Sequence, residues 1–360
     1  MPASLPFRTY LITGGAGFVG SSLALRLKRE VPGAEVIALD NLKRRGSELN
    51  LPRLREAGVK FIHGDVRERS DLLGLPHIDA LVECSAEPSV LAGYQGGADY
   101  VQDTNLVGTL NCLALVARDK ADLVFLSTSR VYPIAAINAM CIEESEGFRI
   151  DPASAPVGAG ERGIAEDFPV AGARTLYGAT KLASELMIEE YAQMHGFRYV
   201  IDRCGVIAGP WQMGKTDQGF VLLWLARHLW QQQLAYTGFG GQGKQVRDVL
   251  HVDDLCDLVL AQLNDMDRVN GHVLNAGGGA KNADTLRGFT DRCARITGNH
   301  IAVGSDPAER PGDLKLYVTD NTRVTALTGW APKRDIDTLL QDSLAWLRQH
   351  EEQLRVILGQ

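Results

Sequence analysis

Residues 10–25 read YLITGGAGFVGSSLAL, and the rest of the chain is organised around this stretch. An apolar strand leads into a glycine cluster, and an apolar-periodic helix follows it. Gly14 and Gly15 can turn sharply because they have no Cβ atom, and Gly17 lets the backbone approach a pyrophosphate. Gly20 lets helix and strand pack closely, while the helix N-terminus faces the anion. The stretch predicts a dinucleotide site with contacts from Gly14, Gly17, Phe18, Val19 and Gly20.

A second strand, residues 35–39, ends in an acidic residue, Asp40, about 20 residues beyond the glycine cluster. A carboxylate at this place accepts hydrogen bonds from a ribose diol and repels a 2′-phosphate, so Asp40 favours NAD over NADP. Asn41 lies next to it and joins the expected cofactor contacts. The basic run KRR at residues 43–45 follows at once, and two interpretations stay open: it holds a 2′-phosphate, or it is a solvated loop.

The composition is that of an ordinary globular protein with a sizeable core, since 45% of the 360 residues are hydrophobic. A net charge of -7 argues against a nucleic-acid surface, and no apolar run is long enough to span a membrane. Six cysteines are scattered without a C-x-x-C pair, which predicts neither a disulfide framework nor a metal site. We therefore expect a cytoplasmic protein that binds no metal, nucleic acid or membrane.

Strand and helix patterns alternate along the first two thirds of the chain. Short apolar runs, separated by helical stretches, occur at residues 60–63, 80–84 and 123–127. This alternation predicts a parallel sheet with helices on both faces, the Rossmann-type doubly wound α/β fold. We expect the cofactor domain to comprise residues 1–206 and 246–276, and a smaller α/β substrate-binding domain to comprise residues 207–245 and 277–360.

Ligands of open α/β sheets bind beyond the carboxyl ends of the strands, so the residues at those ends are candidates for the site. Asp65 and Val66 follow the third predicted strand and are placed to reach an adenine, although Asp65 as a plain turn residue is an equal alternative. Ser85 and Ala86 close the fourth strand and are expected to line the same crevice.

Three features between residues 98 and 174 bear on this site. The helix predicted for residues 98–118 carries Asn105 in its apolar face, where we expect a structural bridge beside the cofactor. The fifth strand ends in Ser127, Thr128 and Ser129, hydroxyl groups that lie where a reacting group would sit but are also common caps. Residues 133–174 are rich in proline and glycine, which predicts a long loop or a lid.

The pair formed by Tyr177 and Lys181 carries the strongest catalytic indication. The two residues are four apart in a predicted helix, so their side chains project from one face. A nearby ammonium lowers the pKa of a phenol, which would make Tyr177 a usable general base near neutral pH. Together with the Thr128 hydroxyl and the cofactor cradle, the pair predicts a catalytic site.

These motifs together resemble the extended short-chain dehydrogenase/reductase family of NAD-dependent sugar-nucleotide epimerases and dehydratases, across nearly the whole chain. The matching residues are GGAGFVG with Asp40, STSRVY at 127–132, YGATK at 177–181, GKQVRDVLHVDD at 243–254 and RPGD at 310–313. A closer similarity, to the CDP-paratose 2-epimerases (also called CDP-tyvelose epimerases), rests on DNLKRRGSELNL at 40–51, TDQGFV at 216–221 and GKQVRDVLH at 243–251.

The resemblance implies a role for each matched residue. Tyr177 is the acid/base, Lys181 is its electrostatic partner and a ribose ligand, and Thr128 hydrogen-bonds the sugar. Arg247 and Arg310 meet the diphosphate of a nucleotide sugar, because guanidinium forks suit phosphate oxygens. The full set of substrate contacts implied is Thr128, Ser129, Gln218, Arg247 and Arg310. The family also implies NAD as the cofactor and a homodimer built from two long helices.

Departures from the family pattern narrow the reaction. Dehydratases carry an Asp-Glu pair directly after the catalytic threonine, and decarboxylases carry a glutamate there, whereas this chain has Ser129 and Arg130. Val206 stands where relatives usually have an asparagine, and residues 85–88 read SAEP instead of a run of small residues. Elimination therefore lacks its usual acid and base, while epimerisation needs neither.

We expect an epimerase that oxidises a sugar carbon transiently to a keto-sugar and returns the hydride to the opposite face. A dehydratase or an NAD(P)-dependent reductase is the first alternative, and it would take its acid from the predicted lid: Glu143, Glu144 or Glu161. A noncatalytic NAD-binding scaffold is the alternative of another class, and the intact pair of Tyr177 and Lys181 argues against it.

Overall fold

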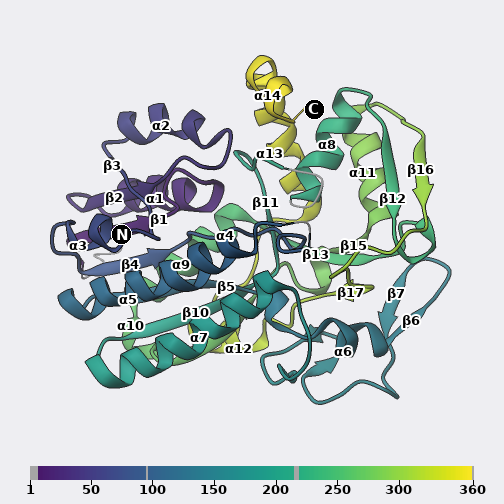
Figure 1. The fold of residues 1–360 in the computed structure, drawn as a ribbon. Coiled ribbons are helices and arrows are strands. Elements are labelled where there is room, and N and C mark those ends of the chain that lie inside the picture. Colours follow the sequence, from purple (N-terminus) through teal and green to yellow (C-terminus); the bar gives the residue numbers. More distant parts are fainter. Residues whose placement is uncertain (1–6, 95, 215–218, 359–360) are drawn as a thin grey trace.

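The computed structural model describes residues 7–94, 96–214 and 219–358. Within these ranges, seven parallel strands form the central sheet (Figure 1). Its order is β14 (His272–Ala276), β10 (Tyr199–Cys204), β5 (Asp122–Thr128), β4 (Ala80–Glu83), β1 (Thr9–Thr13), β2 (Glu35–Asp40) and β3 (Lys60–His63). The strand order runs outward in both directions from the β1/β4 boundary, so the prediction of a doubly wound α/β fold is confirmed.

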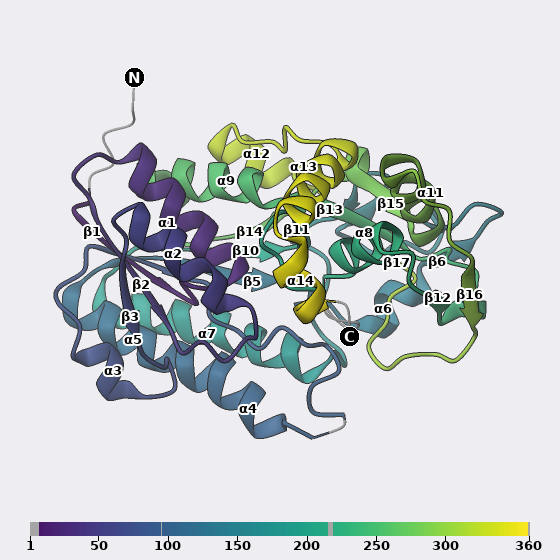
Figure 2. The same ribbon diagram turned by 90° about the horizontal axis from the view of Figure 1, so that it is seen from above.

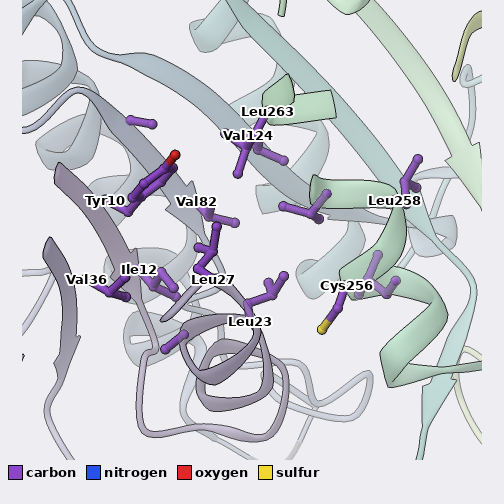
Figure 3. Close-up of a cluster of buried hydrophobic side chains, with 14 of the residues drawn as sticks. Tyr10, Ile12, Leu23, Leu27, Val36, Val82, Val124, Cys256, Leu258 and Leu263 are labelled. Carbon is purple, nitrogen blue, oxygen red and sulfur yellow. The ribbon is translucent and has the colours of Figure 1, made fainter. Parts of the chain in front are cut away.

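Alternating side chains of the strands build two separate cores, one on each face of the sheet. Tyr10 and Ile12 of β1 point into one core, and Leu11 between them points into the other. Figure 3 shows the first core, where residues such as Leu23 and Leu258 come from the covering helices. Both faces are therefore fully covered, which explains why these strands appear in the sequence as continuous apolar runs.

The helices divide between the two faces as the cores require (Figure 2). One face carries α1 (Phe18–Glu30), α2 (Leu51–Glu56), α9 (Val252–Asn264), α10 (Met266–Val269) and α12 (Thr322–Thr328). The other face carries α3 (Arg69–Leu73), α5 (Gly108–Asp119) and α7 (Leu176–His195).

The predicted helix of residues 98–118 is not continuous. It consists of α4 (Ala98–Gln102), a π-helical turn (Asp103–Val107) and α5. A π turn inserts an extra residue into the helical repeat and re-aims the side chains that follow it. The turn contains Asn105, which is 1% exposed and makes its hydrogen bonds to neighbouring segments.

A second lobe packs beside the carboxyl ends of the central strands (Figure 1). Its sheet contains β11 (Val206–Ala208), β13 (Val246–His251), β15 (Ala283–Thr285) and β17 (Leu316–Tyr317), and β12 (Leu234–Thr237) pairs with β16 (Val303–Asp306). The helices are α8 (Phe220–Leu229), α11 (Leu286–Thr297), α13 (Ile336–Gln349) and α14 (Glu351–Leu358). β14 returns to the central sheet while β13 does not, and the exact domain limits remain a prediction.

The expectation of an irregular loop or lid for residues 133–174 is wrong. The segment contains α6 (Ile134–Ala139), the pair β6 (Cys141–Glu143) and β7 (Phe148–Ile150), and the pair β8 (Ala159–Gly160) and β9 (Gly163–Ile164). Buried side chains such as Ile137 and Phe168 share a core with Leu314 and Tyr317. The strands are two or three residues long, too short for a detectable period, so their packing could not be read from the pattern.

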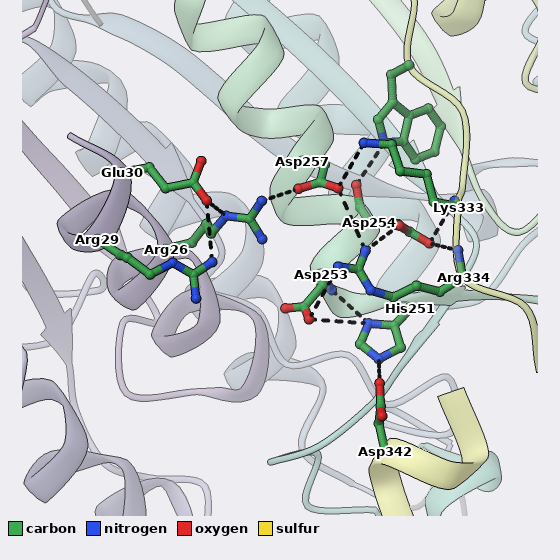
Figure 4. Close-up of polar contacts among 11 residues, drawn as sticks. Arg26, Arg29, Glu30, His251, Asp253, Asp254, Asp257, Lys333, Arg334 and Asp342 are labelled. Carbon is green, nitrogen blue, oxygen red and sulfur yellow. Dashed lines mark hydrogen bonds and ion pairs between the residues drawn. The ribbon is translucent and has the colours of Figure 1, made fainter. Parts of the chain in front are cut away.

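Ion pairs join α9 to α1 of the same face and to the second lobe (Figure 4). Arg26 of α1 pairs with Asp257 of α9 at 2.5 Å, and Arg334 pairs with the buried Asp254 at 2.6 Å. The Arg334 pair links α9 to the segment that leads into α13 of the second lobe. Among the described residues, no helix is both long and apolar enough to cross a membrane.

Candidate active site

A cavity of about 1220 Å³ opens between the carboxyl ends of the central strands and the second lobe. A pocket for one drug-sized ligand measures about 300–1,000 Å³, so this cavity has room for a dinucleotide beside a second ligand. The predicted site residues that line it are Gly14, Gly17, Phe18, Val19, Gly20, Asp40, Asn41, Val66, Ser85, Ala86, Ser127, Thr128, Ser129, Tyr177, Arg247 and Arg310. Within the described part of the chain, Asp65, Asn105 and Lys181 lie outside this lining, and Gln218 lies outside the described residues.

The glycine cluster forms a tight turn that leaves no space for side chains. Gly14 has φ +63°, a conformation that favours glycine, and a Cβ on Gly20 would lie 2.2 Å from the Gly14 carbonyl oxygen. A Cβ on Gly15 would lie 2.6 Å from the Cβ of Ala38 on β2. No side chain caps the N-terminus of α1, so its amides face the cavity as an anion site. The turn therefore fits the pyrophosphate of a dinucleotide.

Asp40 closes this end of the cavity at the carboxyl end of β2. Its Oδ1 accepts a hydrogen bond from the Leu42 amide at 2.8 Å, and its Oδ2 accepts one from the Ala16 amide at 3.1 Å. Burial raises the pKa of Asp40 although these amides act in the opposite direction. The carboxylate is thus fixed beside the glycine turn and lines the cavity where the ribose of the cofactor is expected.

The basic run after Asp40 is anchored to the second lobe. The Arg44 guanidinium donates to the Met213 carbonyl at 2.6 Å, and the Arg45 guanidinium donates to the Val356 carbonyl at 3.0 Å. Lys43 lies 5.3 Å from the centroid of the Tyr100 ring. Arg44 and Arg45 thus bridge the cofactor end of the sheet to the second lobe, while Lys43 and Arg44 also line the cavity.

The two hydroxyls at the end of β5 have different surroundings. The Thr128 hydroxyl lines the cavity and accepts a hydrogen bond from the Arg130 amide at 3.2 Å. The Ser127 hydroxyl is hydrogen-bonded to the buried carboxylate of Glu185 on α7. Thr128 is therefore the hydroxyl available to a ligand, and Ser127 fastens the strand to the helix.

Tyr177 lies in the first turn of α7, directly opposite the end of β5. The α7 cap is Thr175, whose hydroxyl accepts from the Gly178 amide at 3.4 Å. Tyr177 lines the cavity, and burial raises its pKa to about 12, while a hydrogen bond from Thr128 and the charge of Arg130 act to lower it. The expected lowering of this pKa by Lys181 is not found, because desolvation of the phenolate outweighs the nearby charges.

Lys181 is 1% exposed and lies beneath the cavity wall, with its ammonium 3.6 Å from the centroid of the Phe125 ring. Burial lowers the pKa of Lys181, and the carboxylates of Glu83 and Glu185 act to raise it. The buried Lys181 ammonium is therefore surrounded by the Phe125 ring and by two carboxylates that favour its charged form. Its predicted contact with the cofactor ribose remains a prediction.

Asn105 and Asp65 both hold polypeptide segments together. The Asn105 side chain accepts from the Glu87 amide at 2.7 Å and donates to the Glu87 carbonyl and to Thr180 on α7. Asp65 pairs with Arg67 at 2.6 Å, which lowers the pKa of Asp65 to about 2. Asp65 also accepts from the Asn41 side chain at 2.9 Å, so it shapes the turn rather than the cavity surface.

The substrate side of the cavity is lined by arginines. Arg247 of β13 pairs with Asp313 at 2.8 Å and donates to the Leu314 carbonyl at 2.7 Å. The exposed Arg310 donates to the Thr237 hydroxyl at 3.0 Å. Both guanidinium groups line the cavity, and their predicted contact with a diphosphate remains a prediction.

Arg130 was singled out in the sequence only because it stands where relatives carry an acidic residue. Its guanidinium lines the cavity and donates to the Gly312 carbonyl at 2.8 Å, which joins the end of β5 to the RPGD loop. Burial, together with the charge of Arg247, lowers the pKa of Arg130 to about 10. The aromatic residues Trp211 and Trp224 also line the cavity, and no spacing rule pointed to them.

Comparison with known proteins agrees with this geometry. Residues 10–277 match the model of the NAD dependent epimerase/dehydratase family. The chain belongs to this family. The match runs from β1 to the residue after β14, and so includes the glycine turn, Thr128, Tyr177 and Arg247.

Relatives within this epimerase/dehydratase family differ in their reactions. The chain is 28% identical to a CDP-paratose 2-epimerase of Salmonella typhi, over 93% of this chain and 98% of that one. It is 27% identical to a dTDP-glucose 4,6-dehydratase of Streptomyces niveus, over 94% and 93%. The solved UDP-glucose 4-epimerase of Thermus thermophilus, a complex with NAD, superposes with a TM-score of 0.74 at 26% identity, covering 94% of this chain and 99% of that one.

NAD is the cofactor of this family, and the residues present here fit it. The glycine turn and the α1 N-terminus would hold the pyrophosphate, and Asp40 would hold the adenosine ribose. The prediction of NAD as the cofactor is thereby confirmed, as is membership of the family that the sequence motifs indicated.

Proposed function

We propose that this protein is an NAD-dependent epimerase of a nucleotide-diphosphate sugar, similar to the CDP-paratose 2-epimerases. The observation that carries the proposal is a cavity in which Tyr177 faces the end of β5 while the two positions after Thr128 carry no acid. Where dehydratases have their Asp-Glu pair, Ser129 and Arg130 line the cavity, and Arg130 is hydrogen-bonded to Gly312.

Carboxylates elsewhere do not replace the missing acid. Glu143 pairs with Lys244 at 2.7 Å and Glu144 pairs with Arg149, both on the outer side of the 133–174 segment. Neither of these residues, nor Glu161, lines the cavity in the described part of the chain. Asp313 and Glu87 do line it, but Asp313 is paired with Arg247 and Glu87 accepts a hydrogen bond from the Ser89 amide at 3.1 Å. This distribution favours epimerisation over loss of water.

Each residue of the cavity then has a defined task. Arg247 and Arg310 bind the diphosphate and so orient the sugar toward β5 and α7. Thr128 holds the reacting hydroxyl, and the Tyr177 oxygen accepts its proton and later returns it. Bound NAD supplies reversible acceptance of hydride from the sugar carbon. The keto-sugar exposes its other face after turning within the roomy cavity, and no net oxidation results.

A panel of CDP-, UDP-, GDP- and dTDP-sugars, each deuterated at the carbon to be oxidised, tests the proposal. An epimer of unchanged mass that keeps its deuterium is the expected product. A product that has lost one water would identify a dehydratase, and stoichiometric release of reduced cofactor would identify a net oxidoreductase; either result would overturn the proposal.

The Tyr177→Phe variant separates an enzyme from an NAD-binding scaffold. Loss of the proton acceptor should lower kcat by about 10²–10⁴-fold, while NAD content and melting temperature stay as in the wild type. Turnover that persists unchanged would show that Tyr177 is not the acid/base. If the wild type turns over none of the sugars, the protein is better described as a noncatalytic NAD-binding scaffold.

The proposed quaternary state is a homodimer. Exposed apolar residues lie on one face of the sheet, Val107 in the π-helical turn before α5 and Leu186 and Met194 on α7, with 39%, 58% and 71% exposure. Exposed apolar side chains gathered on adjacent helices are typical of a surface that pairs with another chain.

A further inference from the structure

A buried charged group lies directly under the catalytic helix. Glu83 of β4 is the register partner of Phe125 on β5, so the two side chains project from the same face of the sheet, toward α5 and α7. The Lys181 ammonium lies on the Phe125 ring, 3.6 Å from its centroid. Glu83 is thereby placed beside the ammonium of the catalytic pair.

Glu83 is 1% exposed and only half satisfied. Its Oε1 accepts a hydrogen bond from the Thr109 hydroxyl at 2.6 Å, and the Cys112 thiol, a weak donor, also acts on the carboxylate, while the buried Oε2 has no well-formed hydrogen bond among the described residues. A buried carboxylate oxygen without a partner is costly unless a positive charge is near it. Burial raises the pKa of Glu83, and the first group that acts to lower it is Lys181.

The second carboxylate near Lys181 is already engaged. Glu185 lies one turn along α7 and pairs with Arg203 at 2.7 Å, and it also accepts from Ser127. Glu185 and Arg203 therefore compensate each other. This leaves Glu83 and Lys181 as the uncompensated anion and cation in this part of the interior.

We propose that Glu83 is the counter-ion of Lys181: a positioning residue that keeps the ammonium charged and held on the Phe125 ring, next to Tyr177. No carboxylate in the described ranges lies within ion-pair distance of the ammonium, so the interaction acts through the low-dielectric interior rather than by direct contact. The catalytic consequence rests on the proposed function, but the charge state of Lys181 does not.

Besides Tyr177, ionisable groups from several elements act on this pair. Around Lys181 they are Glu83 and Cys84 from β4, Glu185 from α7 and Cys204 from β10, and around Glu83 they are Lys181 and Cys112. Burial raises the pKa of each of these thiols, so the cysteines stay neutral. Burial alone lowers the pKa of Lys181, and Glu83 is the first of the groups that oppose this.

The charge state can be measured directly by NMR of full-length protein labelled with 13Cε-lysine and saturated with NAD, with the Lys181 resonance assigned from Lys181→Arg. In the wild type, the resonance should not move between neutral and moderately alkaline pH. In Glu83→Gln, removal of the anion should lower the titration midpoint by at least about one pH unit. An unchanged midpoint in Glu83→Gln would overturn the proposal.

Asp202→Asn is the matched control. Asp202 is also a fully buried carboxylate with one unpartnered oxygen, but it lies on β10 and accepts from Gln262 of α9, on the opposite face of the sheet. This variant should leave the Lys181 resonance as in the wild type; a shift equal to that of Glu83→Gln would contradict a specific role for Glu83. Should Glu83→Gln not fold, a wild-type Lys181 that loses its proton near neutral pH would by itself overturn the proposal.

Kinetics add a readout that a purely structural role would not move. In Glu83→Gln, kcat/KM should fall relative to the wild type as the pH rises through the lowered midpoint, about tenfold at one pH unit above it. The ratio of wild-type to variant activity should shrink as the pH falls, because Lys181 regains its proton. A ratio that is constant with pH would overturn the positioning role. If the protein turns over no nucleotide sugar, the proposed function fails, whereas the NMR result still decides the charge state.

Discussion

Replacement of Gly20 by alanine provides a quantitative test of the cofactor cradle. The new Cβ would lie 2.2 Å from the Gly14 carbonyl oxygen, whereas ordinary contacts begin at 3.4 Å, so the turn or α1 must move by 3.4 − 2.2 = 1.2 Å. Overpacking of this kind costs about 1–3 kcal/mol, and the higher helix propensity of alanine returns about 1 kcal/mol. The steric cost should prevail, because the opposing atom belongs to the backbone and has little freedom to move.

The expected result is a melting temperature lower by a few degrees, since each kcal/mol shifts Tm by about 2–4 °C in chains of 150–250 residues. Displacement of the Gly14 carbonyl and the α1 amides should also weaken NAD binding about tenfold or more, which corresponds to about 1.4 kcal/mol. Calorimetric titration gives the affinity, and mass spectrometry of the denatured protein gives the NAD that it carries as purified.

Gly160→Ala is the control for this test. No atom lies within 4 Å of the Cβ that it would add, and its φ is not in the positive range. Its NAD content should stay at the wild-type level. Its melting temperature should stay the same or rise slightly, because alanine lowers the conformational entropy of the unfolded chain. If Gly20→Ala behaves as Gly160→Ala does, the close approach between Gly14 and Gly20 is not what holds the cofactor site together.

Burial raises the pKa of Asp202 to about 7. The neutral carboxyl group is tolerated in the interior, so the wild type keeps its full stability below the unfolded pKa of Asp202 and loses stability as the pH rises through the folded pKa. In urea unfolding, the free energy of unfolding of Asp202→Asn should therefore rise by a few kcal/mol relative to that of the wild type between pH 4 and pH 8. Arg247→Met should raise KM for the nucleotide sugar about 10–100-fold, whereas Arg162→Met, which removes a side chain with 76% exposure, should not. Sedimentation should give twice the chain mass of 39.1 kDa; a single-chain mass at micromolar concentration would refute the homodimer, and Leu186→Glu should shift the protein to that mass.

Local spacing in the sequence was sufficient to predict the glycine turn that binds the cofactor and the parallel sheet. The glycines at 14, 17 and 20 act within one turn of chain, and the apolar runs report burial on both faces of the sheet. Tyr177 and Lys181 could be paired because a four-residue separation brings side chains to one helical face. These features depend on neighbours in the chain, which is why the fold and the cofactor were predicted correctly.

Features that depend on packing were mispredicted or missed. The short strands of residues 133–174 gain order only by burial against residues 314–318, which are far away in the chain. The pKa of Tyr177 was expected to be lowered, but it is raised to about 12, because desolvation is a property of the folded environment. The hydrogen bond from Arg130 to the Gly312 carbonyl joins residues that are 182 positions apart, so no local sequence pattern could predict it.

The sequence by itself determined the architecture and the family, and it singled out the pair of Tyr177 and Lys181, since each depends on periodicities and motifs of a few residues. Only the tertiary structure decided what surrounds that pair. Glu83 and Lys181 are separated by nearly a hundred positions, and the parallel register of β4 with β5 and the docking of α7 bring them to one place. Burial and charge compensation arise from these long-range contacts, because the dielectric environment of a group is set by all the atoms packed around it.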